Sequence, residues 1–206
     1  MKTFEQPLSD ELDLAIAFHG HKCPALAVGL RAGHAALDAL GVERAHNKEL
    51  RVESETGEGH AMGCFLDGLS VVTGCTCGKG NLHKLHHDKI AFTLVEMATG
   101  RAVRVGVKGD FLEHALLSPF VEQRRQGVPP EEIPAEITDP AVARILALPE
   151  ADFLQVGNVK QVVLDPPRVS FEVRPCASCQ ELTFVTGMVA RGPGEFVCRT
   201  CAGHPL

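Results

Sequence analysis

The chain has 206 residues, 45% of them hydrophobic, so it is long enough to bury a substantial core. It contains ten phenylalanines but no tryptophan or tyrosine, so aliphatic side chains must fill most of that core. The formal net charge of −6 argues against general binding to nucleic acid or to an anionic membrane surface. No apolar run approaches the roughly 20 residues of a membrane span, and the early sequence turns acidic without an apolar signal core. We therefore expect a cytoplasmic protein.

Helix signals dominate the first forty residues. The spacing of apolar residues predicts a helix with Ser9 as its N-cap that ends near Phe18. Pro24 suits the first position of a second helix, which we expect to run to about Leu40, before a glycine. The short connection between the two helices reads HGHKC, and it places Cys23 at the N-cap of the second helix.

The following segments alternate between strand and helix patterns. We predict, in chain order, a strand at 49–54, a helix at 64–74, a glycine-rich loop, two strands within 89–108, a helix at 110–127 bent near Pro119, a proline-rich connection, a short helix at 139–149 and one or two strands within 153–165. Helices before and among non-local strands indicate an α+β core domain over residues 1–165. A linker at 165–167 precedes a small domain over residues 166–206.

Eight cysteines fall into two sets, one in the first half of the chain and one in its last 31 residues. In a cytoplasmic protein such cysteines indicate metal ligands or redox groups rather than structural disulfides. The C-terminal set forms two Cys-x-x-Cys pairs that flank a segment typical of a β-hairpin: Cys176, Cys179, Cys198 and Cys201. This spacing predicts a closed, structural zinc site whose ion supplies folding free energy to a small module. The module is nearly neutral, so a nucleic-acid-binding role is disfavoured.

Three potential ligands lie within the sequence FHGHKCP, namely His19, His21 and Cys23. Imidazole and thiolate are good ligands for Zn²⁺, Ni²⁺ or Fe²⁺. A helix N-terminus also favours the thiolate form of Cys23, which suits redox or nucleophilic chemistry as well as metal ligation. An ordinary N-cap cysteine with two surface histidines is the remaining interpretation.

Two further stretches carry cysteines near predicted helix ends. Cys64 starts a helix, where its thiolate is again favoured. The loop TGCTCGKGN contains Cys75, Cys77 and Lys79, but its spacing does not match a Walker A motif. Its glycines indicate close backbone approach to an ion, an anion or another chain.

The sequences FHGHKCPALAVGLRAG, CFLDGL and TGCTCGKGNL, in that order, resemble the FmdE family, named for a component of formylmethanofuran dehydrogenase. The resemblance spans about residues 12–110, and the C-terminal module resembles a treble-clef zinc finger. It implies a thioredoxin-like α+β core, with a mixed sheet flanked by helices, and a homodimer. It also implies a metal-binding active site built from the histidine and cysteine motifs.

The same resemblance distributes roles among individual residues. It implies a core site for zinc, nickel or iron with ligands drawn from five residues: His19, His21, Cys23, Cys64 and Cys75. Cys23 and Lys79 are the catalytic candidates, with Lys79 either binding an anionic substrate group or holding its loop. Cys77 occupies a variable position of the motif, and no role is assigned to it.

Several other histidines invite a metal hypothesis. His83, His86 and His87 are predicted to lie in a solvated loop. His60, four residues before Cys64, is a candidate for substrate binding or proton transfer, as is His19.

Three functions compete. The first is a metal-dependent redox or hydrolytic enzyme, with an open position at the core metal. The second is a metal or cofactor carrier, or a non-catalytic partner of a molybdenum or tungsten oxidoreductase in one-carbon metabolism. The third, a zinc-dependent regulator that binds DNA, is disfavoured by the acidic charge. No cluster resembles a molybdopterin-binding or ferredoxin-type protein, so this chain alone is not a complete formylmethanofuran dehydrogenase.

Overall fold

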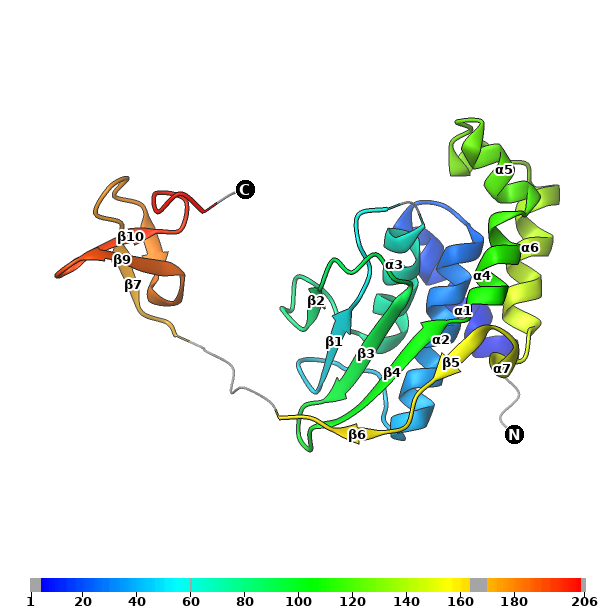
Figure 1. Cartoon of the computed structure of the whole chain (residues 1–206), viewed down its shortest axis with the longest axis horizontal. Coiled ribbons are helices and arrows are strands. Elements are labelled where there is room, and N and C mark those ends of the chain that lie inside the picture. Colours follow the sequence, from blue (N-terminus) through cyan, green and yellow to red (C-terminus); the bar gives the residue numbers. More distant parts are fainter. Residues whose placement is uncertain (1–4, 60, 164–169, 205–206) are drawn as a thin grey trace. The chain divides into compact units, whose positions relative to one another are not determined.

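A computed structural model describes residues 5–59, 61–163 and 170–204 (Figure 1). The chain divides into two compact units, Met1–Val163 and Leu164–Leu206. The predicted linker at 165–167 lies outside the described residues. Each unit is described below by itself.

The first unit is built on a mixed β-sheet. Its strands are β1 (Leu50–Ser54), β2 (Leu82–Lys84), β3 (Ala91–Glu96), β4 (Arg101–Val107), β5 (Leu154–Val156) and β6 (Lys160–Gln161). The strand order is β2-β1-β3-β4-β5, and β6 pairs with the far end of β4. β1 and β2 are parallel, whereas the other pairs are antiparallel. The sheet therefore needs one crossover, and α3 lies within it.

Helices flank this sheet. They are α1 (Glu5–His19), α2 (Pro24–Leu40), α3 (Met62–Thr73), α4 (Gly109–Leu116), α5 (Pro119–Arg125), α6 (Ala135–Ala147) and α7 (Glu150–Phe153), with a 3₁₀ turn at Pro130–Glu132. α2 packs on β3, β4 and β5, and Figure 1 looks onto the opposite face of the sheet. None of the helices in the described part of the chain is long and apolar enough to cross a bilayer. The predicted α+β class is confirmed, and the thioredoxin-like arrangement stays a prediction.

Three element boundaries differ from the sequence-based expectation. α1 begins at Glu5, so Ser9 lies inside the helix. Pro7 does not prevent this, because N–H groups in the first turn have no partner within the helix. α6 begins at Ala135 and contains Pro140, so the proline-rich connection is shorter than predicted. The short strand β2 lies in the predicted loop after α3, held by parallel pairing with β1.

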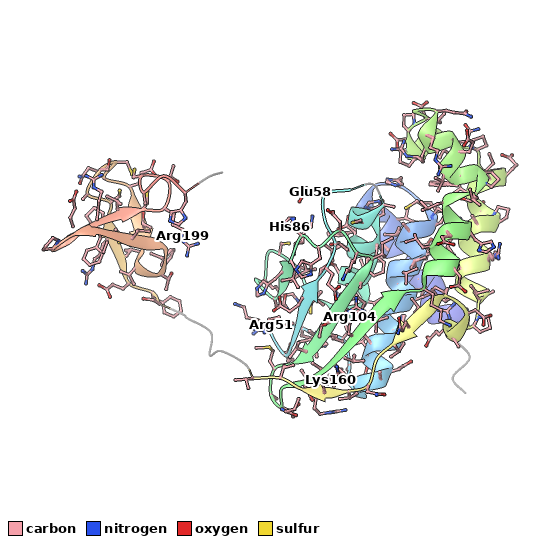
Figure 2. The ribbon with its side chains drawn as sticks, in the orientation of Figure 1. Arg51, Glu58, His86, Arg104, Lys160 and Arg199 are labelled. Atoms are coloured by element: carbon pink, nitrogen blue, oxygen red, sulfur yellow. The ribbon has the colours of Figure 1, made fainter. Side chains whose placement is uncertain are left out.

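Ion pairs cover part of the sheet face opposite α2. Arg104 on β4 donates two hydrogen bonds to the carboxylate of Glu55, with distances of 2.5 and 2.9 Å, and Arg51 pairs with Glu53 at 2.8 Å. Figure 2 shows Arg51 and Arg104 among the side chains of this part of the sheet. The hydrogen bonds from Arg104 lower the pKa of Glu55, although burial opposes them. Because Glu55 follows β1 directly, this pair holds the start of the connection that leads to α3.

The closest contact between helices is the glycine-mediated packing of α2 against α3. A Cβ atom at Gly29 would lie 2.0 Å from the carbonyl oxygen of Phe65, and one at Gly68 would lie 2.3 Å from that of Leu26. Further along both helices, Gly33 packs on Val72. Contacts therefore advance along both helices together, so the helices run in the same general direction. Their N-termini lie at the same end of the unit.

The second unit contains two small sheets and almost no hydrophobic core. β7 (Val173–Pro175) pairs with β8 (Leu182–Phe184), and β9 (Met188–Gly192) pairs with β10 (Glu195–Cys198), with a 3₁₀ turn at Val185–Gly187 between them. Its buried hydrophobic residues are Cys176 and Val197, among the residues that the structure describes. So small a core cannot stabilise the unit without a further crosslink.

We predict that Gly29→Ala destabilises the first unit by about 1–3 kcal/mol, because the added methyl group would collide with the backbone of α3. Thermal or urea unfolding would measure the change. Gly63→Ala is the matched control, since Gly63 also lies in a helix but a Cβ there would meet no atom within 4 Å. An equal loss in both variants would contradict the packing role.

Candidate metal centre

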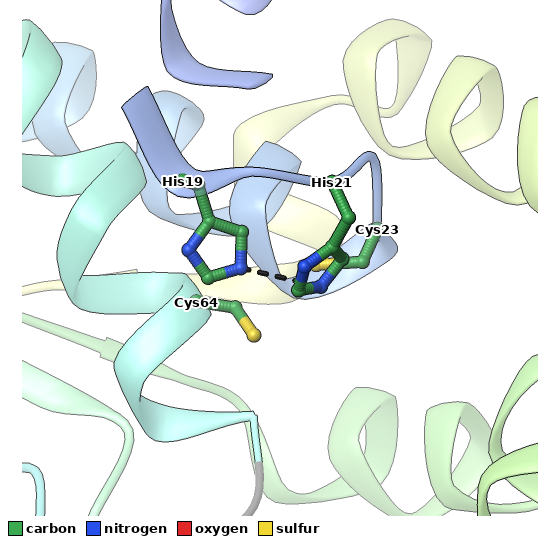
Figure 3. Close-up of side chains that lie close together, drawn as sticks. All are labelled: His19, His21, Cys23 and Cys64. Carbon is green, nitrogen blue, oxygen red and sulfur yellow. Dashed lines mark hydrogen bonds between the residues drawn. The ribbon is translucent and has the colours of Figure 1, made fainter. Parts of the chain in front are cut away.

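Four side chains from separate elements converge at the shared N-terminal end of α2 and α3 (Figure 3). His19 is the last residue of α1, His21 lies in the following turn, Cys23 is the N-cap of α2, and Cys64 lies in the first turn of α3. One ligand atom from each residue lies within 4.8 Å of all the others. The four residues form a candidate His₂Cys₂ metal centre, which we call the core centre.

Local sequence explains how three of these ligands are presented. Gly20 adopts a φ of 97° and donates its N–H to the carbonyl oxygen of Ile16, which ends α1 immediately after His19. The backbone of Cys23 is extended, with φ −151° and ψ 159°, and Pro24 starts α2 as predicted. The turn therefore reverses the chain in a few residues and leaves both imidazoles beside Cys23.

Distances within the core centre fit a tetrahedral ion. The Nε2 atoms of His19 and His21 lie 3.2 Å apart. Two imidazole nitrogens on one tetrahedral Zn²⁺ would lie about 3.3–3.4 Å apart, given metal–nitrogen bonds of about 2.0–2.1 Å. Two imidazoles and two thiolates are also a donor set that zinc and related divalent metals accept. These residues thus fit a transition-metal ion.

A carboxylate orients one of the imidazoles. Asp67 Oδ2 lies 2.7 Å from Nδ1 of His19, so the His19 Nδ1–H donates to the carboxylate and Nε2 faces the centre. Asp67 follows Cys64 by three residues on α3, which places both on one face of the helix. Such a second partner fixes the tautomer of a metal-bound histidine and increases its basicity. Sequence reasoning missed Asp67, although the three-residue spacing within CFLD was a usable signal.

The two sulfurs of the core centre share a proton. The hydrogen bond from Cys23 lowers the pKa of Cys64 to about 5, with further help from His19 and His21, while burial opposes the shift. For Cys23, interaction with the Cys64 thiolate and then burial raise the pKa well above its ordinary value. One thiolate is therefore present near neutral pH, and a bound cation would deprotonate the second sulfur.

Cys75 and Lys79 do not join the core centre. Cys64 lies in the first turn of α3 and Cys75 lies beyond its last residue, about 16 Å further along the helix axis. Cys75 is fully buried, and burial raises its pKa to about 11. The Lys79 ammonium lies 3.4–3.5 Å from the carbonyl oxygens of Ala45 and His46, so it holds the connection between α2 and β1.

The other histidines of the sequence hypothesis lie apart from the core centre or outside the described residues. His86 Nδ1 lies 3.4 Å from Glu58 and His83 Nδ1 lies 3.2 Å from Glu53, and both imidazoles are exposed (Figure 2). None of the ligand groups found among the described residues includes them. His60 lies outside the described residues. Cys77 is exposed in its loop.

The second unit holds the other candidate centre, formed by the predicted set Cys176, Cys179, Cys198 and Cys201. The Sγ atoms of Cys179 and Cys198 lie 4.0 Å apart, close to the separation of about 3.8 Å expected for two thiolates on one tetrahedral Zn²⁺. Backbone N–H groups donate to these sulfurs, including that of Cys198 to Cys176 at 3.3 Å and that of Cys201 to Cys198 at 3.4 Å. Amide bonds from Cys179 and Cys198 lower the pKa of Cys176 to about 6. This Cys₄ cluster is consistent with a zinc finger.

The protein thus combines an α+β unit, with a His₂Cys₂ centre at paired helix N-termini, and a small Cys₄ unit. Residues 18–155 match the family model described as FmdE, molybdenum formylmethanofuran dehydrogenase operon. That match covers more than half of the chain. The chain belongs to the FmdE family.

Two individual proteins extend this comparison. The chain is 31% identical over 199 residues to a protein of Archaeoglobus fulgidus named as a probable S-adenosyl-L-methionine-binding protein; the match covers 90% of this chain but only 50% of that protein. The chain therefore spans half the length of that relative. The fold is similar to the crystal structure of a tungsten formylmethanofuran dehydrogenase (FmdE)-like protein from Syntrophus aciditrophicus, with a TM-score of 0.59 and 21% identity, over 97% of this chain and 94% of that one.

We predict that Asp67→Ala weakens metal binding at the core centre by about 10- to 100-fold, because His19 loses the acceptor that orients it. Asp67→Asn keeps an acceptor without the charge, so its loss should be smaller. Competition with a chromophoric chelator would measure both affinities. Asp38→Ala, which changes an exposed carboxylate of α2, is the control. A core affinity unchanged in Asp67→Ala would contradict the orienting role.

We predict a different outcome at the Cys₄ cluster. Cys176→Ser removes a fully buried ligand from a unit with almost no core, so it should loosen the second unit and leave the first intact. Hydrogen exchange resolved by segment would show loss of protection confined to residues 170–204. Loss of protection in the β-sheet of the first unit would contradict this separation.

Proposed function

We propose that this protein binds one divalent transition-metal ion at the core centre and one structural zinc ion at the Cys₄ cluster. The observation that carries the proposal is the convergence of His19, His21, Cys23 and Cys64 within 4.8 Å. The ion in the core centre is zinc, nickel or iron, since imidazole and thiolate ligands suit all three. When bound, the ion supplies Lewis acidity, and the protein's residues hold it and orient its ligands.

We further propose that the protein serves molybdenum- or tungsten-dependent one-carbon redox metabolism as an accessory protein, carrying a metal or cofactor or docking on an oxidoreductase. The description of its family as part of a formylmethanofuran dehydrogenase operon supports this context. Four protein ligands in the core centre support an accessory role, because they complete a tetrahedral coordination and leave no open position. The alternative, an enzyme that acts at the core metal, requires one of these ligands to leave.

Two expectations about the setting accompany this proposal. A reducing compartment such as the cytoplasm would keep the thiols of both clusters available for metal, since none is in a disulfide. We also propose a homodimer, because the sheet face opposite α2 presents strands β1, β3 and β4 directly to the viewer in Figure 1.

Metal content per chain, measured by elemental mass spectrometry on protein purified without oxygen, tests the two-centre proposal. We expect two equivalents in the wild type, one for each ligand group. Cys64→Ser should lose the core equivalent because a thiolate ligand is removed, and Cys176→Ser should lose the zinc of the second unit.

Cys77→Ser is the matched control, because it removes a thiol that lies in neither cluster. It should retain both equivalents. One equivalent of zinc in the wild type, unchanged in Cys64→Ser, would refute the core centre and leave only the structural finger.

A further inference from the structure

The four ligands of the core centre are held with unequal firmness. His19 belongs to α1 and donates a 2.7 Å hydrogen bond to Asp67. Cys23 is the N-cap of α2 and is only 2% exposed, and Cys64 is fixed in α3. Each of these three ligands is therefore held by a helix.

His21 is held by the turn alone. It lies outside both helices, one residue after Gly20, where a Cβ would meet no atom within 4 Å. Within the described chain, its imidazole has one hydrogen-bond contact, the Nε2 of His19, which is itself directed at the centre. No carboxylate or carbonyl group among the described residues fixes its second nitrogen as Asp67 fixes that of His19.

We propose that His21 is an exchangeable ligand, and that the core centre functions as a three-ligand site of His19, Cys23 and Cys64 whose fourth position accepts an external donor. This inference rests on the proposed function, since it requires a metal ion in the core centre. Two cysteines and one histidine form a ligand set that leaves zinc an open position for substrate in known catalytic sites. Departure of His21 needs only movement of a short turn, because no helix has to shift.

The external donor that this position suits is a small thiolate. The N-terminal ends of α2 and α3 both point to the centre and carry partial positive charge, which favours an anion over a neutral donor. Two sulfur ligands already make the site soft, and soft metal sites prefer sulfur donors over carboxylate or water. In the exchange, the metal–imidazole bond breaks and a metal–sulfur bond forms, with no change of oxidation state. The departing His21 nitrogen can take the proton released by the incoming thiol.

Substitution of the two histidines, one at a time, tests the unequal roles. In the full chain loaded with Co²⁺, we expect His21→Ala to retain the core ion with an affinity reduced by no more than about tenfold. We expect His19→Ala to lose about 100-fold, as for loss of an oriented ligand. Competition with a chelator gives both affinities, and far-ultraviolet circular dichroism checks that each variant is folded.

Binding of 2-mercaptoethanol tests the fourth position directly. Its addition should change the ligand-field absorption of Co²⁺ in the wild type, and His21→Ala should respond at about tenfold lower concentration because no side chain has to leave first. Cobalt in the Cys₄ cluster contributes a constant background. The Cys64→Ser variant, which keeps only that cluster, measures this background and should not respond.

The outcomes separate this inference from the proposed function. Two metal equivalents in the wild type, together with a cobalt spectrum that thiol leaves unchanged, would overturn the exchange of His21 and leave the core centre as a closed site. Loss of core metal from His21→Ala as severe as from His19→Ala would do the same. A single equivalent in the wild type would overturn the core centre itself.

Discussion

The close packing of α2 on α3 is the constraint on which the core centre depends. Cys23 and Cys64 are far apart in sequence, and they meet because the two helices approach until the Cα of Gly29 faces the backbone of Phe65. Because the helices run in the same general direction, both cysteines lie at N-termini. The same contact therefore sets the separation of the sulfurs and the sign of the local field. A larger side chain at Gly29 or Gly68 would separate the ligands as well as the helices.

Helix termini and burial act on the thiols in opposite directions. The amide N–H groups at the start of α2 favour a thiolate at Cys23, yet burial and the neighbouring Cys64 thiolate outweigh them. The protein alone therefore stabilises one negative charge in the core centre, on Cys64. A divalent cation supplies the charge that two thiolates require, so metal binding and loss of the second proton are coupled.

Local signals made much of the fold and part of the site predictable from sequence. Pro24 and the glycine after Leu40 define the ends of α2, and Cys23 is its N-cap as predicted. The strand β2 was missed because its three residues are held by pairing with β1, which no local pattern records. The grouping of Cys75 with Cys64 came from motif resemblance rather than geometry. The length of α3 separates these two cysteines, whereas the same helix brings Asp67 to His19.

The two centres differ in what the surrounding protein needs from a metal. In the second unit the buried hydrophobic residues are Cys176 and Val197 among those described, so an ion there must replace a core. The first unit has a large packed core, including Phe65, Phe92 and Leu94, that joins the sheet to α2 and α3 without any ion. A metal ion in the core centre is therefore not needed to form the fold. Its coordination can change without unfolding the unit, so a ligand on a turn can exchange while the helices hold the other three.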